Sequence, residues 1–182
     1  MKVLQIGVIG SAGPEEYAYR KPVVKMAAVA EDIGYALAKS GCITVTGGKG
    51  GIMEAASRGA KRGGGITVAE TSGLQRFTAN AYVDVEVVTG DIAYRGPSQL
   101  VAMSDAVLCL GGGAGTLQEL CVAYRMQKPI VLVPGYGGWT DRLAGRKWLD
   151  ERRLVAFSIE RDPVKAVKLA INLVQSTNKE EI

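Results

Sequence analysis

The stretch Asp105-Ala-Val-Leu-Cys-Leu-Gly-Gly-Gly-Ala-Gly-Thr-Leu-Gln-Glu119 joins an apolar run, typical of a buried strand, to a helical pattern through a glycine-rich turn. The first turn of such a helix has unpaired backbone N–H groups, and the helix dipole adds positive potential there. A phosphate or a similar anion is the expected occupant of this position. We therefore predict an anion-binding cradle formed by the N–H groups of Gly112, Gly113, Ala114, Gly115 and Thr116.

Two side chains accompany this predicted cradle. Thr116 can add a hydroxyl, and Glu119 follows three residues later on the same face of the helix. A carboxylate beside an anion cradle suits contact with the sugar or base that is joined to the phosphate. The segment is therefore predicted to bind a phosphorylated small molecule.

The rest of the chain alternates short apolar runs with longer amphipathic segments, which is the pattern of an α/β protein. The strand runs are almost continuously apolar, so we expect a mostly parallel sheet of six to seven strands with helices on both faces. Strands are predicted near 4–9, 42–46, 66–69, 83–88, 106–110 and 130–133, with a short last strand near 155–158. Helices are predicted at about 23–39, 51–62, 97–103, 116–126, 140–148 and 163–175.

Length and composition indicate one globular domain that spans residues 1–182, with a frayed tail over 176–182. The net charge of +4 is small, and basic residues are interleaved with acids, which disfavours a nucleic-acid surface. No apolar run approaches the ~20 residues of a membrane span, and no signal peptide is visible, so a cytoplasmic protein is expected.

The chain contains no histidine. A Ser-His-Asp triad, a histidine-based zinc site and the commonest general base are thereby excluded. The three cysteines, Cys42, Cys109 and Cys121, lack metal-ligand spacing and are interpreted as free thiols, of which Cys42 and Cys109 lie in strand-like runs. We expect neither a metal site nor a required cofactor.

Glycine-rich turns follow four of the predicted strands. Open α/β sheets bind ligands at the carboxyl ends of their strands, so these turns are expected to share one pocket. Besides the cradle, the predicted lining residues are Gly10, Ser11, Gly47, Gly48 and Lys49. Lys49 could offer a charge to a phosphate or be a solvated surface lysine. The turn spacings match neither the dinucleotide fingerprint nor the Walker loop.

Two further residues have alternative interpretations. Pro97 suits a first helical position, which places Arg95 just before a helix near the same edge of the sheet. Arg95 could clamp an anion with two parallel hydrogen bonds, or could be solvated. Trp139 could stack on a base or pterin-like ring, or could cover the edge of the core.

The Gly-Gly-x-Gly-Thr-x-x-Glu119 motif, taken with Thr46-Gly-Gly-x-Gly-Gly-Ile-Met-Glu54, resembles a known superfamily. It contains the LOG-type phosphoribohydrolases, often labelled "possible lysine decarboxylases", and the molybdenum-cofactor carrier proteins. The resemblance covers residues 6 to about 173, and the segment Gly-Gly-Trp-Thr-Asp141 is most similar to the carrier branch. It implies a Rossmann-like three-layer α/β/α sandwich that assembles as a homodimer or homotetramer.

The hydrolase branch implies catalytic roles for Glu119 and for an arginine before the helix that leads into the motif strand. In this chain Gly96 stands at that arginine's position, Arg95 lies one residue earlier, and Pro97 replaces the lysine that usually follows. Gly111 replaces the proline that begins the branch's glycine motif. Nothing in the sequence indicates the pyridoxal-phosphate lysine that a decarboxylase needs.

Two functions therefore remain open. One is binding of a nucleotide monophosphate or a molybdopterin-like cofactor, which the departures around Arg95 favour. The other is hydrolysis of the N-glycosidic bond of a nucleoside 5′-monophosphate, with Glu119 stabilising the oxocarbenium-like transition state and Arg95 holding the phosphate or the departing base.

Overall fold

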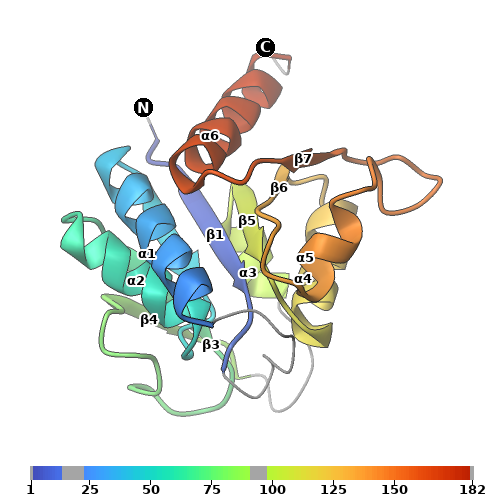
Figure 1. Ribbon diagram of the computed structural model, residues 1–182. Helices are drawn as coiled ribbons and strands as arrows, with labels where there is room; N and C mark the ends of the chain where they lie inside the picture. Colours follow the sequence, from blue (N-terminus) through green and yellow to red (C-terminus); the bar gives the residue numbers. More distant parts are fainter. Residues whose placement is uncertain (1, 14–22, 91–97, 181–182) are drawn as a thin grey trace.

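The computed structural model describes residues 2–13, 23–90 and 98–180. A parallel sheet of seven strands forms the centre of the protein, in the order β4-β3-β2-β1-β5-β6-β7 (Figure 1). The strands are β1 (Gln5–Gly10), β2 (Ile43–Thr46), β3 (Thr67–Thr71), β4 (Val85–Val88), β5 (Ala106–Leu110), β6 (Ile130–Leu132) and β7 (Phe157–Ile159). The helices are α1 (Val23–Lys39), α2 (Ile52–Arg62), α3 (Ser98–Met103), α4 (Ala114–Arg125), α5 (Gly138–Leu143) and α6 (Pro163–Glu180).

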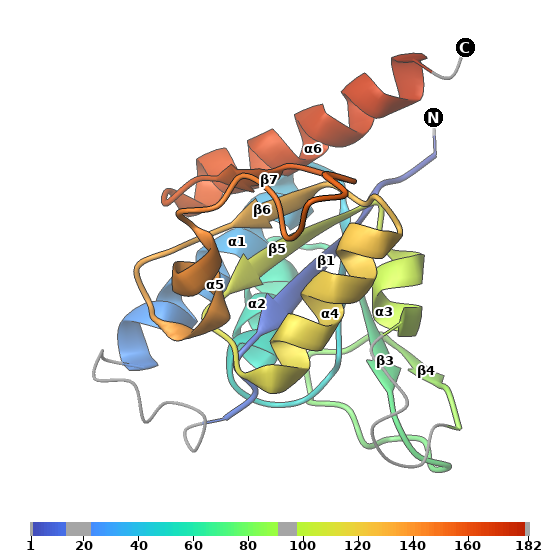
Figure 2. The ribbon, with the colours of Figure 1, turned by 90° about the vertical axis from the view of Figure 1, so that its right-hand side faces the viewer.

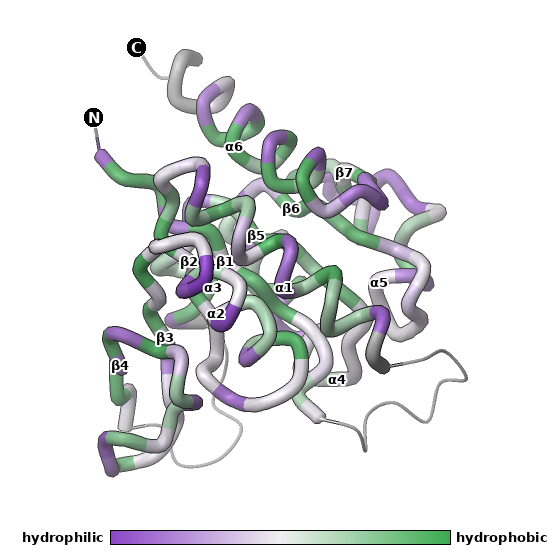
Figure 3. Tube along the Cα trace, turned by 60° about the vertical axis from the view of Figure 1, so that its left-hand side comes forward, coloured by the Kyte–Doolittle hydropathy of each residue, from purple (hydrophilic) through white to green (hydrophobic). Residues whose placement is uncertain are grey.

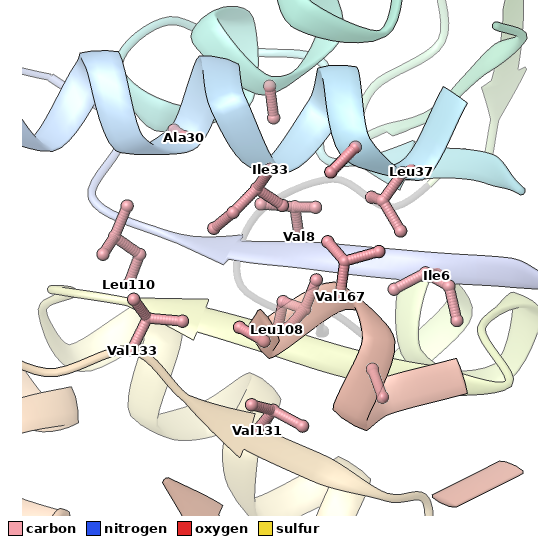
Figure 4. Packing of buried hydrophobic residues seen from close by; sticks show 14 of the residues in the cluster. Ile6, Val8, Ala30, Ile33, Leu37, Leu108, Leu110, Val131, Val133 and Val167 are labelled. Carbon is pink, nitrogen blue, oxygen red and sulfur yellow. The ribbon is translucent and has the colours of Figure 1, made fainter. Parts of the chain in front are cut away.

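Helices cover both faces of the sheet, which makes the predicted three-layer Rossmann-like sandwich (Figure 2). Buried side chains of α1, α2 and α6 pack on one face, in the cluster that contains Val8 and Leu108 (Figure 4). Buried side chains of α3, α4 and α5 pack on the other face, in the cluster that contains Ile9 and Cys109. Each fully buried Ile or Leu side chain stabilises the fold by about 1.5–3 kcal/mol, so these two clusters are its main support.

The amphipathic pattern of α6 shows how the sequence directs this packing. Hydrophobic and hydrophilic segments alternate along the helix (Figure 3). Ala166, Val167 and Ala170 are buried against the sheet, whereas Lys165 and Lys168 are exposed. Among the described residues, no helix is both long and apolar enough to cross a membrane.

Two elements differ from the sequence prediction. The helix expected over 140–148 is α5, which begins at Gly138 and already ends at Leu143. A tighter turn follows, in which the Arg146 N–H donates to the Leu143 carbonyl at 2.8 Å, and Gly145 disfavours further helix. The loop beyond is fixed instead by the buried Tyr124, whose hydroxyl donates to Asp150 at 2.7 Å and accepts the Leu154 N–H at 3.0 Å.

The second difference concerns the end of the chain. The helix expected over 163–175 is α6, which continues as far as Glu180. The hydroxyls of Ser176 and Thr177 donate to the carbonyl oxygens four residues earlier, at 2.9 and 3.0 Å, and so stay compatible with the helix.

Helices α1 and α2 touch through their backbones. A Cβ on Gly34 would lie 1.9 Å from the Ala56 carbonyl oxygen, and one on Gly59 would lie 1.9 Å from the Glu31 carbonyl oxygen. Arg58 and Arg62 then bind the Glu31 carboxylate at 2.9 and 2.7 Å. These glycines therefore set the separation of the two helices.

We predict that Gly59→Ala destabilises the protein although alanine is the better helix former. The propensity gain of about 1 kcal/mol is outweighed because neither backbone can yield, and such overpacking costs typically 1–3 kcal/mol. Denaturant unfolding measures the change. Gly115→Ala is the matched control, since nothing lies within 4 Å of a Cβ at that helical glycine. Equal stability of Gly59→Ala and the wild type would contradict the close contact.

Candidate functional site

The order of the strands creates a crevice between the connections that follow β1 and β5. From β1 the chain winds through β2, β3 and β4 in one direction, and β5, β6 and β7 extend the sheet in the other. The connections that leave β1 and β5 therefore run to opposite faces, and ligands of open α/β sheets bind in the crevice between two such connections. The glycine turns after β1 and β5 border this crevice.

Helix α4 begins in the crevice with an uncapped first turn. Its N-cap is Gly113, in extended conformation, and Leu117 is the first residue whose N–H bonds back to it, at 3.1 Å. Within the described ranges, the N–H groups of Gly113, Ala114, Gly115 and Thr116 form no hydrogen bond. Ala114 and Gly115 are exposed. The turn thus presents donors and the positive end of the helix dipole to an incoming anion.

The structure corrects the prediction for Gly112. Its N–H donates to the Ser11 hydroxyl oxygen at 2.9 Å, so the donor set begins one residue later, at Gly113. A Cβ on Gly112, whose φ is +96°, would lie 2.4 Å from the Thr116 Cβ. Gly112 therefore serves the local fold by letting the turn pack on Thr116, and the Thr116 side chain is correspondingly buried.

Ser11 connects three of the glycine turns. Its hydroxyl accepts the Gly112 N–H, and its carbonyl oxygen accepts the Ile52 N–H at 3.1 Å, at the start of α2. The preceding Gly10 is packed so closely that a Cβ there would lie 2.0 Å from the Leu110 carbonyl oxygen. The sequence prediction that these turns gather at one edge of the sheet agrees with this arrangement.

A fourth turn, between β6 and α5, holds the carbonyl groups of the cradle. The Gly111 oxygen accepts the Thr140 N–H and hydroxyl at 3.1 and 2.8 Å, and the Gly112 oxygen accepts the Trp139 N–H at 3.0 Å. Asp141 stabilises this turn by accepting the Gly135 N–H at 2.7 Å. Two carbonyl oxygens that would repel an anion are thereby bonded to α5, and the amides after Gly112 are left for the ligand.

The turn after β2 contributes less than the sequence suggested. The Gly48 N–H donates to the Thr46 hydroxyl at 3.1 Å, and its carbonyl accepts the Asn80 N–H and side-chain amide at 2.7 and 3.0 Å. The polar groups of Gly48 are therefore bonded within the protein. Gly47 is partly exposed and Lys49 is exposed, so both stay candidates for the pocket lining.

Asn80 belongs to the loop 72–84, in which the segment 77–79 is held by the Glu86 carboxylate. Glu86 accepts hydrogen bonds from the N–H groups of Phe77, Thr78 and Ala79 and from the Thr78 hydroxyl. Phe77 has a φ of +66°, unusual for a bulky residue, and this anchor holds it there.

Two further polar side chains are Cys109 in β5 and Glu119 in α4. Burial raises the pKa of the Cys109 thiol to about 12. The hydrogen bond with the Thr140 hydroxyl, 3.0 Å away, lowers this pKa, and the negative charge of Glu119 raises it. Cys109 is thus a neutral structural thiol and no nucleophile. Glu119 is partly buried, and its negative charge acts on Cys109 in β5.

The remaining predicted residues are placed as follows. Trp139 is partly buried against the α3–α4–α5 core with the Arg142 guanidinium 4.9 Å above its ring, so it covers the edge of the core. Arg95 lies in 91–97, outside the described residues. In the part of the chain that the structure describes, no group of three His, Cys, Asp or Glu side chains could hold a metal ion. The sequence analysis missed Glu70, a buried acid at the end of β3.

Comparison with known proteins identifies the family. The profile of the SLOG cluster4 family matches residues 3–165, and the chain belongs to that family. An uncharacterized protein of Archaeoglobus fulgidus is 35% identical over 130 residues, which cover 71% of this chain and 80% of the relative.

Solved structures share the fold over nearly the whole chain. The structure of TM1055, a structural-genomics target, has a TM-score of 0.81 at 31% identity and is matched over 93% of this chain and 99% of its own. The molybdenum cofactor carrier protein of Chlamydomonas reinhardtii has a TM-score of 0.78 at 26% identity, over 96% and 99% of the two chains. The molybdenum cofactor binding protein of Rippkaea orientalis has a TM-score of 0.76 at 27% identity, over the same shares.

We predict that Ser11→Ala destabilises the protein by about 1–3 kcal/mol, because the buried Gly112 N–H then has no acceptor. Denaturant unfolding provides the measurement. Ser176→Ala removes a hydroxyl whose bond lies on the exposed side of α6 and should change stability by at most about 0.5 kcal/mol. If both variants unfold alike, Ser11 does not hold the turns together.

Proposed function

We propose that this protein binds a phosphorylated small molecule, a nucleotide or a molybdopterin-like cofactor, with the phosphate on the N–H groups of Gly113 to Thr116. The main support for this proposal is the uncapped first turn of α4, which lies at the point where the strand order of the sheet reverses. An anion there satisfies donors that would otherwise depend on water, and it meets the positive end of a helix of 12 residues.

The charges near the turn support this proposal. The first turn of α4 contains no acidic residue that would compete with a phosphate for the N–H groups. The exposed Lys49, in the neighbouring glycine turn, adds positive charge at the same edge of the sheet. The bonded carbonyl groups of Gly111 and Gly112 remove two sources of repulsion.

The comparisons support a carrier-like role. Two of the similar structures are a carrier protein and a binding protein of the molybdenum cofactor, and both align with almost the whole chain. We extend the proposal to a cytoplasmic homodimer or homotetramer without a required cofactor, in which the bound molecule is cargo.

The cradle is tested by removing one N–H group without changing the charge. Proline is favoured at the first position of a helix, so Ala114→Pro should fold normally. We expect its affinity for ribose 5-phosphate to fall roughly 10- to 100-fold, as for a lost hydrogen bond to a charged group. Ala114→Ser retains the N–H and is the control in the same calorimetric titration. Unchanged affinity in Ala114→Pro would place the phosphate elsewhere.

A second candidate function is hydrolysis of a nucleoside 5′-monophosphate by water to the free base and ribose 5-phosphate. The position of Glu119 favours it, because this carboxylate lies one helical turn beyond Thr116 and its charge acts on Cys109 in β5. A carboxylate there can stabilise the oxocarbenium-like transition state and orient the attacking water. Arg95 is the proposed partner for the phosphate or the departing base.

For this second function, Glu119→Gln should reduce release of free base from AMP by roughly 10²–10⁴-fold, the usual loss of an acid–base group, while ribose 5-phosphate still binds. Chromatography of the base and calorimetry of the sugar phosphate check the two parts. Gln118→Ala, at an exposed neighbouring position, is the control. Absence of base release by the wild type would leave the carrier function alone, and loss of both properties would refute the role given to Glu119.

A further inference from the structure

Strand β7 ends the sheet beyond β6, and part of its outer edge carries unpaired backbone groups (Figure 1). Alternate residues of a parallel strand direct their N–H and C=O groups to the same side. The Glu160 N–H donates to the Leu132 carbonyl of β6 at 3.1 Å, whereas the Phe157 N–H donates away from β6, to the Lys147 carbonyl at 2.8 Å. The Ile159 N–H therefore also points away from β6, and among the described residues it has no hydrogen-bond partner.

Basic side chains flank this open edge. They belong to the segment between α5 and β7 and to the turn after β7, and they are the exposed Arg146, Lys147, Arg153 and Arg161. Within the ranges that the structure describes, none of the four forms an ion pair. Their positive charge is therefore not balanced inside the protein.

Other arginines of the chain behave differently. Arg58 and Arg62 of α2 are bound to Glu31, and Arg152 is bound to the Asp150 carboxylate, with Nε at 2.8 Å. In the segment 144–156 the remaining acid is Glu151, which is exposed. Unpaired cations are thus a local property of the region beside β7.

Trp148 holds two of these cations in place without neutralising them. The Lys147 ammonium lies 4.7 Å from the centroid of the indole ring, and the Arg153 guanidinium lies 4.8 Å from it. A ring attracts a cation but leaves its charge intact, whereas a carboxylate would cancel that charge. Arg153 also has a φ of +54°, a conformation that non-glycine residues seldom adopt and that concentrates at binding sites.

An extended acidic segment of another protein fits this edge. A strand added beside β7 can accept the Ile159 N–H, and its side chains can bring carboxylates to the cations. The Ile159 side chain, 45% exposed, offers an apolar contact. A second copy of this chain is disfavoured, because its β7 would bring the same cations to the contact. A nucleic acid supplies negative charge but no backbone that continues a sheet.

We propose that β7 is a docking site for an acidic, extended segment of a partner protein, which joins the sheet at Ile159 and pairs with the cations beside it. This inference goes beyond the proposed function and does not depend on the phosphate cradle. In a carrier, such a site binds a partner protein while the cradle holds the cargo.

Fluorescence anisotropy with a labelled short peptide of alternating glutamate and valine tests the proposal. The wild type should bind this peptide, and added salt should weaken the binding. Ile159→Pro removes the outward N–H, a change that an edge strand tolerates, and should lower the affinity roughly 3- to 10-fold. Ile159→Ala retains the N–H and is the control, so it should bind more tightly than the proline variant.

Charge reversal tests the cations. The double variant Arg146→Glu, Lys147→Glu should weaken peptide binding roughly 5- to 10-fold. Lys165→Glu with Lys168→Glu changes the net charge equally at exposed positions of α6 and should have a smaller effect. Trp148→Leu keeps every charge but removes the ring that places two of them, so it should weaken the peptide roughly 2- to 5-fold.

Several outcomes overturn the proposal. They are absence of peptide binding by the wild type, equal weakening by the two double variants, and unchanged affinity in Ile159→Pro. Tighter binding of a single-stranded oligodeoxythymidylate of equal charge, lost in Arg146→Glu, Lys147→Glu, would assign the surface to nucleic acid instead. Thermal unfolding shows whether each variant folds, and if Ile159→Pro does not, Trp148→Leu and the double variants decide. Failure of the wild type to bind ribose 5-phosphate would refute the cradle and leave the site at β7 in place.

Discussion

The hydrogen bond from the Gly112 N–H to the Ser11 hydroxyl is the contact on which the site depends. It joins the ends of β1 and β5, the two strands between which the topology reverses. The same serine accepts the Ile52 N–H through its carbonyl, so the start of α2 is fixed by the same residue. A single small residue, through its side chain and its backbone carbonyl, thus sets where three turns meet, and that meeting positions the start of α4.

In this arrangement the carbonyl groups of the glycine turn are hydrogen-bonded within the protein, whereas its later N–H groups are accessible to a ligand. Carbonyl oxygens at Gly111 and Gly112 are bonded to the start of α5, and the amides that follow remain unbonded in the described part of the chain. An anion therefore meets donors and few acceptors without any lysine or arginine in the turn itself. Both candidate functions use this cradle, and they differ only in what Glu119 does after the phosphate is bound.

The fold was largely predictable from the sequence because its signals are local. Apolar runs such as 106–110 become strands wherever both faces are covered, and the glycine turns mark their carboxyl ends. The bond of Gly112 to Ser11 was not predictable, since it joins residues 101 positions apart in the chain. The face of the sheet that Glu70 occupies was not predictable either, because it depends on the pairing of Val68 with Val45. The short α5 depends likewise on the distant Tyr124, which holds the loop after it.

The hydrogen bonds of Glu86 that anchor the loop 72–84 determine how this loop responds to pH. Desolvation acts to raise the pKa of Glu86, but the hydrogen bonds from Thr78 and from the Phe77 N–H outweigh it and lower the pKa to about 2. A carboxyl whose pKa is lowered by folding stabilises the native state fully above its ordinary pKa, near 4.5, and loses this effect as the pH falls toward about 2. Mild acidification, to a pH above about 4.5, therefore leaves Phe77 in its unusual conformation and the Asn80 contact to the β2 turn in place.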